Sequence, residues 1–251
     1  MNWKDDNQKR MDASESNAEV FRKFVIRWFR NIIAAFVLLS ILMVLCLRWV
    51  NPPTSSFMMQ RRIKAWWHGQ AYQQHYQWVD WDQMDWQIKV AAITSEDQRF
   101  AENWGFDFGQ IHKAIEESKN LKDMRGASTI TQQTAKNLFL WPAHSLFRKG
   151  IEAYFTILLE LFWSKKRILE VYLNIAQFGD NIYGVQAASR YYFHTTAARL
   201  NKSQSALMVT ALPDPYDYDL AHPSPYMIRR RNWVLRYMNK LGNQAYLRRI
   251  E

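Results

Sequence analysis

The segment SLFRKGIEAYFTILLELF (145–162) decides the fold class, because its apolar residues recur every three or four positions. That spacing gives a helix one apolar face, which must pack against other elements to form a core. Ser145 opens the segment and is its predicted N-cap. The apolar face consists of Phe147, Ile151, Tyr154, Phe155, Leu158 and Phe162.

Helical signals of the same kind continue on both sides of this segment. Capping residues and apolar periodicity predict helices over 86–100, 107–119, 128–140, 164–173, 185–193, 203–212 and 225–241. Strand signals are weak, and the 8 glycines and 7 prolines are too few for a loop-rich all-β fold. We therefore predict a mainly α fold, with residues 51–251 forming one domain.

An uncharged run, IIAAFVLLSILMVLCL (32–47), lies near the N-terminus. Extended through Val50, it reaches the roughly 17–25 residues that a membrane-spanning helix needs. A cleaved signal peptide and a buried core helix are the competing interpretations. The run is longer than a usual signal sequence and has no polar face, so we predict a transmembrane helix over 32–50.

Basic residues next to this run predict its orientation. Arg22, Lys23, Arg27 and Arg30 precede it, and positive residues favour the cytoplasmic side of a membrane. We therefore expect residues 1–31 to form a cytoplasmic tail.

The chain has a formal net charge of +10, and residues 51–251 also contain more basic than acidic residues. A basic domain beside a membrane predicts an anionic partner, such as lipid head groups, phosphates or pyrophosphate. No nucleic-acid-binding motif occurs, so nucleic acid is not an expected partner. Cys46 is the only cysteine, which excludes an intramolecular disulfide framework and a Cys-rich metal centre.

A tryptophan-rich stretch over 60–86 predicts a short helix followed by an irregular connection. Two interpretations stay open for its aromatic side chains: they pack against the domain, or they dip into the bilayer surface. The tryptophans are Trp66, Trp67, Trp78, Trp81 and Trp86.

The segment TITQQTAKN (129–137) is largely polar but has one charge, Lys136. At helical spacing Thr129, Gln132 or Gln133, and Lys136 share one face. Neutral donors around one ammonium favour the lining of a groove for a polar, anionic ligand. The alternative is a helix whose polar side chains satisfy neighbouring loops.

Two further clusters contain carboxylates. Arg148 and Glu152 are four residues apart, with Lys149 beside them, and such cations suit phosphate oxygens. The alternative is an ordinary helical ion pair. Glu96 and Asp97 end an apolar helix, where a half-buried carboxyl can serve as a general base and a solvated helix end is the alternative. Two separated carboxylates and a basic groove suit chemistry at an anomeric carbon.

Five motifs follow one another along the chain: SEDQRF (95–100) with GFD (105–107), RGASTITQQTAKN (125–137), RKGIE (148–152), KKRILEVYLN (165–174) and RRNWVLRYM (230–238). In these motifs and their order the chain resembles glycosyltransferase family 51, the peptidoglycan glycosyltransferases that polymerise lipid II, over about residues 60–242. The resemblance implies a helical fold similar to phage lysozyme, with a head lobe and a smaller, membrane-proximal jaw, behind one anchor in a bacterial inner membrane. No Ser-x-x-Lys motif occurs, so we expect a monofunctional member without a transpeptidase domain.

This resemblance implies the reaction and the roles of four charged residues. The growing glycan is transferred from undecaprenyl pyrophosphate to the 4-hydroxyl of the GlcNAc in lipid II, with inversion and a new β-1,4 linkage. Glu96 matches the catalytic base, and Glu152 matches a second essential carboxylate near the pyrophosphate. Lys136 and Arg148 match cations that stabilise the departing pyrophosphate.

The resemblance also implies binding residues and partners. Ser128, Gln132 and Gln133 match groove residues that contact sugar or phosphate. No organic cofactor and no protein metal ligand is expected, although the family is often aided by a divalent cation such as Mg²⁺ or Mn²⁺. The expected partners are lipid II, the growing glycan, the membrane and other cell-wall synthesis or division proteins.

Three positions depart from the usual family pattern. Asn103 stands where a histidine is frequent, and Gln177 and Gln204 stand where glutamates are common. None matches a catalytic position, so we expect changes in local hydrogen bonding or pH response rather than loss of activity. The charged segment 118–125 lies between two motifs, and we expect it to be mobile without substrate.

Two other functions compete with polymerisation. A lytic, glycan-cleaving enzyme would need a single acid and little cationic binding of pyrophosphate, and Lys136 with Arg148 argues against it. A non-catalytic, membrane-tethered scaffold would keep its cellular role after the substitution Glu96→Gln.

Overall fold

The computed structural model of this chain describes residues 3–117, 128–143 and 145–251. The chain divides into two compact units, Met1–Cys46 and Leu47–Glu251, which are considered one at a time. The predicted mobility of 118–125 concerns residues outside those that the structure describes.

The N-terminal unit is formed by one long helix, α1 (Trp3–Trp49). Within it, Phe21–Trp49 is the one helical stretch of the described residues that is long and apolar enough to cross a membrane. Its 29 residues correspond to about 44 Å of helix, more than the roughly 30 Å of a hydrocarbon core. The helix therefore fits a single-pass membrane anchor, and the limits 32–50 stay a prediction.

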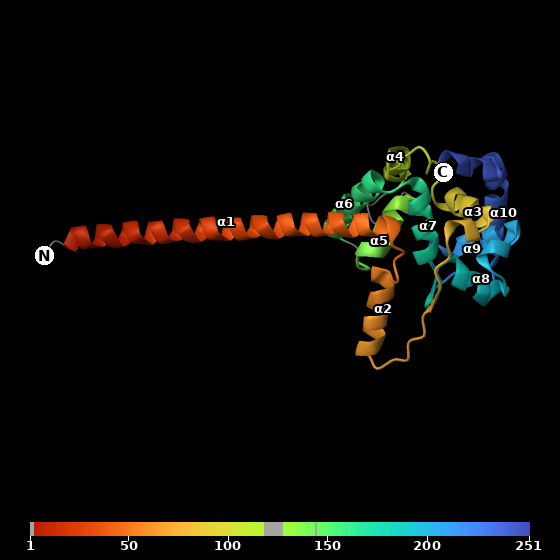
Figure 1. Ribbon diagram of the computed structural model, residues 1–251, viewed down its shortest axis with the longest axis horizontal. Helices are drawn as coiled ribbons and strands as arrows, with labels where there is room; N and C mark the ends of the chain where they lie inside the picture. The colour runs from red at the N-terminus through yellow and green to blue at the C-terminus, as the bar shows by residue number, and fades with distance from the viewer. Residues whose placement is uncertain (1–2, 118–127, 144) are drawn as a thin grey trace. The chain divides into compact units, whose positions relative to one another are not determined.

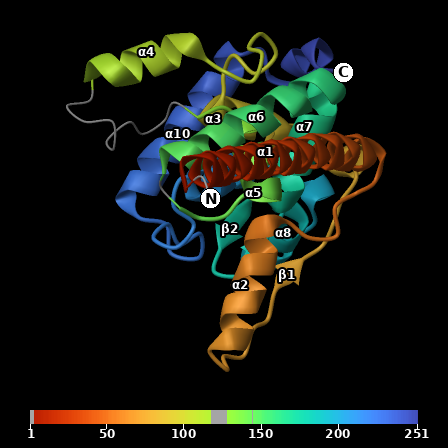
Figure 2. The same cartoon turned by 90° about the vertical axis from the view of Figure 1, so that its left-hand side faces the viewer.

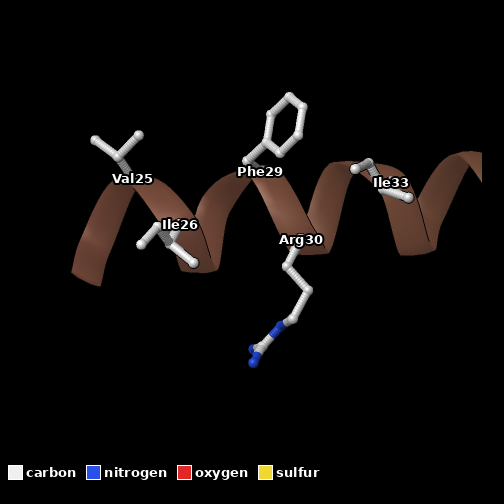
Figure 3. A pocket seen from close by; sticks show the side chains of 5 residues that line it. All are labelled: Val25, Ile26, Phe29, Arg30 and Ile33. Carbon is white, nitrogen blue, oxygen red and sulfur yellow. The ribbon is translucent and has the colours of Figure 1, made fainter. Parts of the chain in front are cut away.

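Arg30 and four apolar side chains line a shallow hollow on the surface of α1. Figure 3 shows Arg30 extending away from the side of the helix that carries Val25 and Phe29. The hollow lined by these residues, Ile26 and Ile33 belongs to this helix alone, so it is a grooved helix surface. A long arginine stem can keep its charge among head groups while neighbouring rings stay in an apolar layer.

The second unit is mainly α, as predicted, with helices and short 3-10 helices in place of long strands (Figure 1). Its α-helices are α2 (Ser56–Trp67), α3 (Trp86–Glu96), α4 (Phe108–Glu117), α5 (Ile130–Phe139), α6 (Leu146–Phe162), α7 (Lys165–Ile175), α8 (Val185–Phe193), α9 (Lys202–Met208) and α10 (Pro225–Lys240). Its 3-10 helices are η1 (Trp81–Gln83), η3 (Ala197–Arg199), η4 (Val209–Ala211) and η5 (Asn243–Arg249).

The predicted helix starts follow from side-chain caps. Ser145 accepts a hydrogen bond from the Arg148 N–H at 3.1 Å, and Ser164 caps α7 in the same way. The N-cap of α5 is Thr129, in a capping box with Gln132. These hydroxyls satisfy N–H groups that the first turn of a helix leaves unpaired.

Several predicted helix ends differ from the structure, and α7, for example, ends at Ile175 and not at residue 173. The helix predicted over 86–100 ends at Glu96, because Asp97 leaves the helical conformation with φ −160°. The helix predicted over 203–212 is shorter as well, since α9 ends at Met208 and η4 continues as a tighter 3-10 helix.

Three short strands form a small sheet in the order β1-β3-β2. β1 (His75–Tyr76) pairs in parallel with β3 (Ile182–Tyr183), which pairs antiparallel with β2 (Gln177–Gly179). Strands of two or three residues are too short to show alternation, which explains their weak sequence signal.

Two groups of helices pack around α3 and α5. α5 packs against α6 and α7, whereas α3 packs against α9, α10 and η5. Figure 2 shows α5, α6 and α7 running close to one another. The residues 88–94 of α3 are all buried, so this helix has no solvent face. The two groups meet where the C-terminal end of α3 approaches α5, and this is where the charged motifs converge.

Gly184 should be intolerant of a side chain. It precedes α8 with φ 79° and ψ 151°, a conformation almost restricted to glycine, and a Cβ would lie 2.5 Å from the Asn174 carbonyl oxygen. We expect Gly184→Ala to lower the free energy of unfolding by about 1–3 kcal/mol or more, measured by denaturation in detergent. The control is Gly150→Ala within α6, where a Cβ meets open space and the change should stabilise by about 0.5–1 kcal/mol. Equal effects of both variants would show that the backbone at Gly184 can accommodate a side chain.

Candidate active site

Glu96 ends α3 as a half-buried carboxylate with a donor on each oxygen. Ser95 donates its hydroxyl to Oε1 at 2.8 Å, and Gln133 donates its amide to Oε2 at 3.0 Å. Tyr172, which is fully buried, donates its hydroxyl to Gln133 Oε1 at 3.1 Å. This chain of hydrogen bonds orients the Gln133 amide and fixes the carboxylate, while lone pairs on Glu96 stay available to another donor.

Arg230 of α10 braces the residue that precedes this carboxylate. Its guanidinium donates to the Ser95 carbonyl oxygen at 3.1 Å and lies over the Trp233 ring, 4.3 Å from the ring centre. The last motif of the chain therefore supports the end of α3.

Asp97 is buried beside Glu96 and connects three segments. Its Oδ1 accepts from the Asn103 amide at 2.7 Å, and its Oδ2 accepts from the Ile130 N–H at 3.2 Å. Burial raises the pKa of Asp97 to about 6, although both hydrogen bonds and the nearby Lys165 ammonium act in the opposite direction. The carboxylate thus ties the end of α3 to the following loop and to the start of α5.

The three unusual residues take local structural roles. Asn103 holds Asp97 and accepts from the Gly105 N–H at 3.2 Å. Gln204 completes a capping box at the start of α9, a position where glutamate and glutamine are both suitable. Gln177 donates to the Gly179 carbonyl oxygen at 3.0 Å.

Glu152 is buried on α6 between two cations. Its Oε2 accepts from Arg148 Nη1 at 2.8 Å, and its Oε1 pairs with the Lys149 ammonium. Arg148 is buried as well, and its Nε donates to the Ala143 carbonyl oxygen. Because Glu152 and Arg148 are both buried, this pair differs from a solvated helical ion pair. Removal of either partner would leave an uncompensated charge in the interior. Both Glu152 oxygens are engaged in holding the two cations in position.

Lys136 of α5 is half-buried and interacts electrostatically with both carboxylates, Glu152 and Glu96. Its ammonium has no hydrogen-bond or ion-pair partner within the described parts of the chain. Burial is the main cause that lowers the pKa of Lys136, and Glu152 opposes it. The positive charges of Arg148 and Lys149 lower this pKa further, whereas Glu96 raises it. Lys136 is therefore close enough to both carboxylates to respond to each.

The charges in this region do not balance. Lys136, Arg148 and Lys149 contribute three positive charges near one buried carboxylate, Glu152, and Glu96 is the second carboxylate that acts on Lys136. An anionic group that enters here would relieve the repulsion among the cations. The arrangement can therefore bind an anion next to a carboxylate base.

The remaining predicted groove residues lie at the start of α5. Gln132 is buried, and its Oε1 accepts from the Thr129 N–H at 3.0 Å, so this oxygen serves the capping box. Ser128 is exposed just before the helix. Of the residues expected to share one face, Gln133 and Lys136 reach the charged centre, whereas Thr129 and Gln132 cap the helix. Contact of Ser128 and Gln132 with substrate stays a prediction.

A buried ion pair supports the loop after Asp97. Glu160 Oε1 accepts from Lys165 Nζ at 2.7 Å and from the Thr131 hydroxyl at 2.6 Å. Gly105, with φ 78°, lies so close to α6 that a Cβ would be 2.7 Å from Thr156 Cγ2. Sequence reasoning missed this support and the Tyr172 contact, because they join motifs that are far apart in the chain.

No group of three or more His, Cys, Asp or Glu side chains positioned to hold a metal ion is found in the described ranges. Glu152 has both oxygens engaged by cations. The divalent cation stays an expectation from the family resemblance, and we assign no step to it.

Comparisons with known proteins agree on one class of enzyme. A family model described as Transglycosylase matches residues 61–239. The chain is similar to the biosynthetic peptidoglycan transglycosylase of Pseudomonas putida, with 44% identity over 227 residues that cover 90% of this chain and 96% of that protein. The protein of the same name from Pseudomonas entomophila is 45% identical over 212 residues, 84% of this chain and 90% of that protein. That from Pseudomonas savastanoi pv. phaseolicola is 42% identical over 225 residues, 90% and 95% of the two chains.

The buried Asp97 carboxyl should make stability depend on pH. Its pKa is about 6 in the folded protein, against an ordinary 3.8, so the folded state binds this proton more tightly than the unfolded chain. The contribution of Asp97 to the free energy of unfolding is therefore largest at low pH and is lost as the pH rises through about 6. Relative to Asp97→Asn, the wild type should lose roughly 3 kcal/mol between about pH 4 and pH 7. Denaturation of both proteins in detergent across this range measures the difference, and a flat or rising difference would contradict the assignment.

Proposed function

The chain belongs to the transglycosylase family and is a peptidoglycan glycosyltransferase, and we propose that it polymerises lipid II into β-1,4-linked glycan with release of undecaprenyl pyrophosphate. Its helical, lysozyme-like domain and its N-terminal apolar helix fit an enzyme that acts on a lipid-linked substrate. The observation that carries the proposal is the Lys136 ammonium, which has no hydrogen-bond or ion-pair partner within the described residues and interacts electrostatically with both Glu96 and the ion-paired Glu152. In the proposed topology the chain crosses the bacterial inner membrane once, with residues 1–31 in the cytoplasm and 51–251 in the periplasm.

Glu96 acts on the acceptor in the proposed reaction. Its carboxylate accepts the hydrogen bond of the GlcNAc 4-hydroxyl and removes the proton as the oxygen attacks the anomeric carbon of the donor. The new C–O bond forms as the bond to the pyrophosphate oxygen breaks on the opposite face, which inverts the configuration. The electron pair leaves with the pyrophosphate, and the proton stays on Glu96. The hydrogen bonds from Ser95 and Gln133 support this role by holding the carboxylate in one orientation.

Lys136 and Arg148 act on the donor. Negative charge grows on the pyrophosphate as the bond breaks, and cations held in a partly buried site stabilise that charge more than they would in water. Glu152 supports this step as a positioning residue, since it orients Arg148 and Lys149. A bound anion favours the charged form of Lys136 and so opposes the burial that lowers its pKa.

The partners follow from the same reaction. We propose that Ser128, Gln132 and Gln133 contact sugar or phosphate groups of lipid II or of the growing glycan. Other cell-wall synthesis or division proteins are further proposed partners, with no surface assigned to them.

Polymerisation of labelled lipid II by the detergent-solubilised full chain tests the proposal. The wild type should form polymer, and Glu96→Gln should reduce the rate by about 10²–10⁴-fold, because the amide cannot take a proton. The matched control is Glu102→Gln, which removes an exposed carboxylate that pairs with Arg99 and Arg249. This control should keep the wild-type rate.

Each other outcome of that assay has a separate meaning. Polymer from both the wild type and Glu96→Gln would place the base elsewhere. Shortening of added glycan without polymer would indicate a lytic enzyme. A folded wild type that does neither would favour a scaffold.

The substitution Lys136→Met should lower the activity of the protein and raise its stability. Loss of the ammonium should lower the turnover rate by about 10²–10³-fold, since charge on the leaving group is no longer stabilised. The same change should raise the melting temperature, because it removes a half-buried cation that lies near Arg148 and Lys149. Lys240→Met, at an exposed site on α10, is the control and should change neither quantity. A lower melting temperature for Lys136→Met would show that this ammonium stabilises the free protein.

A further inference from the structure

A hollow lies where η5 packs against the first turns of α3, away from the end of α3 that carries Glu96. Figure 1 shows the C-terminal end of the chain beside this helix. The hollow has a volume of about 340 Å³, which is within the roughly 300–1,000 Å³ of small-molecule sites. None of its lining residues belongs to the five sequence motifs, so the proposed reaction leaves this hollow unexplained.

A buried cation, Lys89 of α3, lines the hollow and is 5% exposed. Its ammonium has no hydrogen-bond or ion-pair partner among the described residues, and it lies over the Trp81 ring, 4.0 Å from the ring centre. A buried charge normally has a partner, because burial without one is costly. Trp81 is 4% exposed, which confirms packing against the domain for this member of the tryptophan-rich stretch.

The Lys89 nitrogen is still open to the hollow. Within the described part of the chain, the polar side-chain atoms that are both fully enclosed and unpartnered belong to Asn181, Tyr183 and Ser205. The Lys89 nitrogen is not one of these atoms, so it keeps contact with accessible space. A ligand in the hollow can therefore reach it.

The carboxylates near Lys89 do not compensate for its burial. Burial is the main cause that lowers the pKa of Lys89, and the Lys166 ammonium lowers it further. Glu251, Asp82 and Asp85 favour the charged form, yet they do not restore the ordinary pKa. An anion bound beside Lys89 would stabilise the ammonium further.

The other lining residues indicate which kind of anion fits. Arg248 of η5 is exposed and forms no ion pair or hydrogen bond within the described ranges, so its guanidinium is a second cation that a ligand can contact. Guanidinium and ammonium groups both bind carboxylate oxygens well. Gln244 contributes an amide, and Trp86 and Leu247 contribute apolar surface. The hollow therefore suits a molecule with an anionic group and an apolar part.

Glu251 limits the charge of that molecule. It lines the same hollow, and its Oε1 accepts a hydrogen bond from Trp81 Nε1 at 3.3 Å. A ligand with several negative charges would be repelled by this carboxylate. A ligand with one negative charge can contact the two cations and keep its apolar part between them and Glu251.

We propose that this hollow binds a small organic molecule with a single carboxylate group and an apolar body. The carboxylate contacts Lys89 and Arg248, and the apolar body lies against Trp86 and Leu247. The site is separate from the candidate active site, because it lies at the first turns of α3 and Glu96 ends that helix.

Binding of benzoate to the full chain in a non-ionic detergent tests the proposal without any measurement of activity. Benzoate has one carboxylate on an apolar ring. Equilibrium dialysis with labelled benzoate, in a buffer without other carboxylates or phosphate, measures binding above that of detergent alone. Two competitors separate the features of the ligand: benzamide has the same shape without the charge, and inorganic phosphate is an anion without an apolar body.

Three variants identify the site. Lys89→Met and Arg248→Gln should each weaken benzoate binding by about tenfold or more, because each removes a charge-assisted hydrogen bond. The matched control is Arg249→Gln, which changes the next residue of η5, an arginine that pairs with Glu102 at 2.8 Å and does not line the hollow. This control should bind benzoate as the wild type does. Arg248 is exposed, so Arg248→Gln decides the matter alone where Lys89→Met does not fold.

The wild type should bind benzoate saturably, and benzamide and phosphate should compete only weakly. Absence of saturable binding would overturn the proposal and would indicate that water alone fills the hollow. Equal binding by the wild type and Arg248→Gln would also overturn it, since benzoate would then bind elsewhere. Competition by phosphate as strong as that by unlabelled benzoate would overturn the assignment to an organic carboxylate and indicate a general anion site.

Discussion

The structure depends on one buried carboxyl group, that of Asp97, and on the hydrogen bonds that it accepts. It terminates α3, accepts from Asn103 in the next loop and accepts from the first N–H of α5. A buried carboxylate must be hydrogen-bonded, so these three segments are held together by the need to satisfy one side chain. Thr129 adds to this junction by donating its hydroxyl to the Gly105 carbonyl oxygen at 2.7 Å. The Asp97 carboxyl group holds the end of α3 against the start of α5. Glu96 immediately precedes Asp97, so the candidate active site lies beside this contact.

Much of the fold could be predicted from local signals. Apolar periodicity and capping serines predict α6 and α7, and the bounds predicted for α8 match the observed Val185–Phe193. The end of α3 could not be predicted, because Asp97 leaves the helix for partners that are distant in sequence. The short strands have no period to detect.

The charged residues of the candidate site could be named from sequence motifs, whereas the positions of its glutamine side chains could not. Glu96, Lys136, Arg148 and Glu152 come from separate motifs, and the structure gathers them in one region. A glutamine three residues after Thr129 fits both a capping box and a groove, so sequence alone leaves the place of Gln132 undecided. The Tyr172 contact with Gln133 had no local signal, because it depends on how α7 packs against α5.

The crowded Lys136 ammonium has a consequence for product release in the proposed reaction. When undecaprenyl pyrophosphate departs, the cations are again left without a compensating anion, so exit is electrostatically unfavourable and recurs at every addition to the strand. Burial and the neighbouring cations lower the pKa of Lys136, so the charged ammonium is held less favourably in the empty site than beside a bound anion. The interaction that stabilises charge on the leaving group therefore also holds the product back.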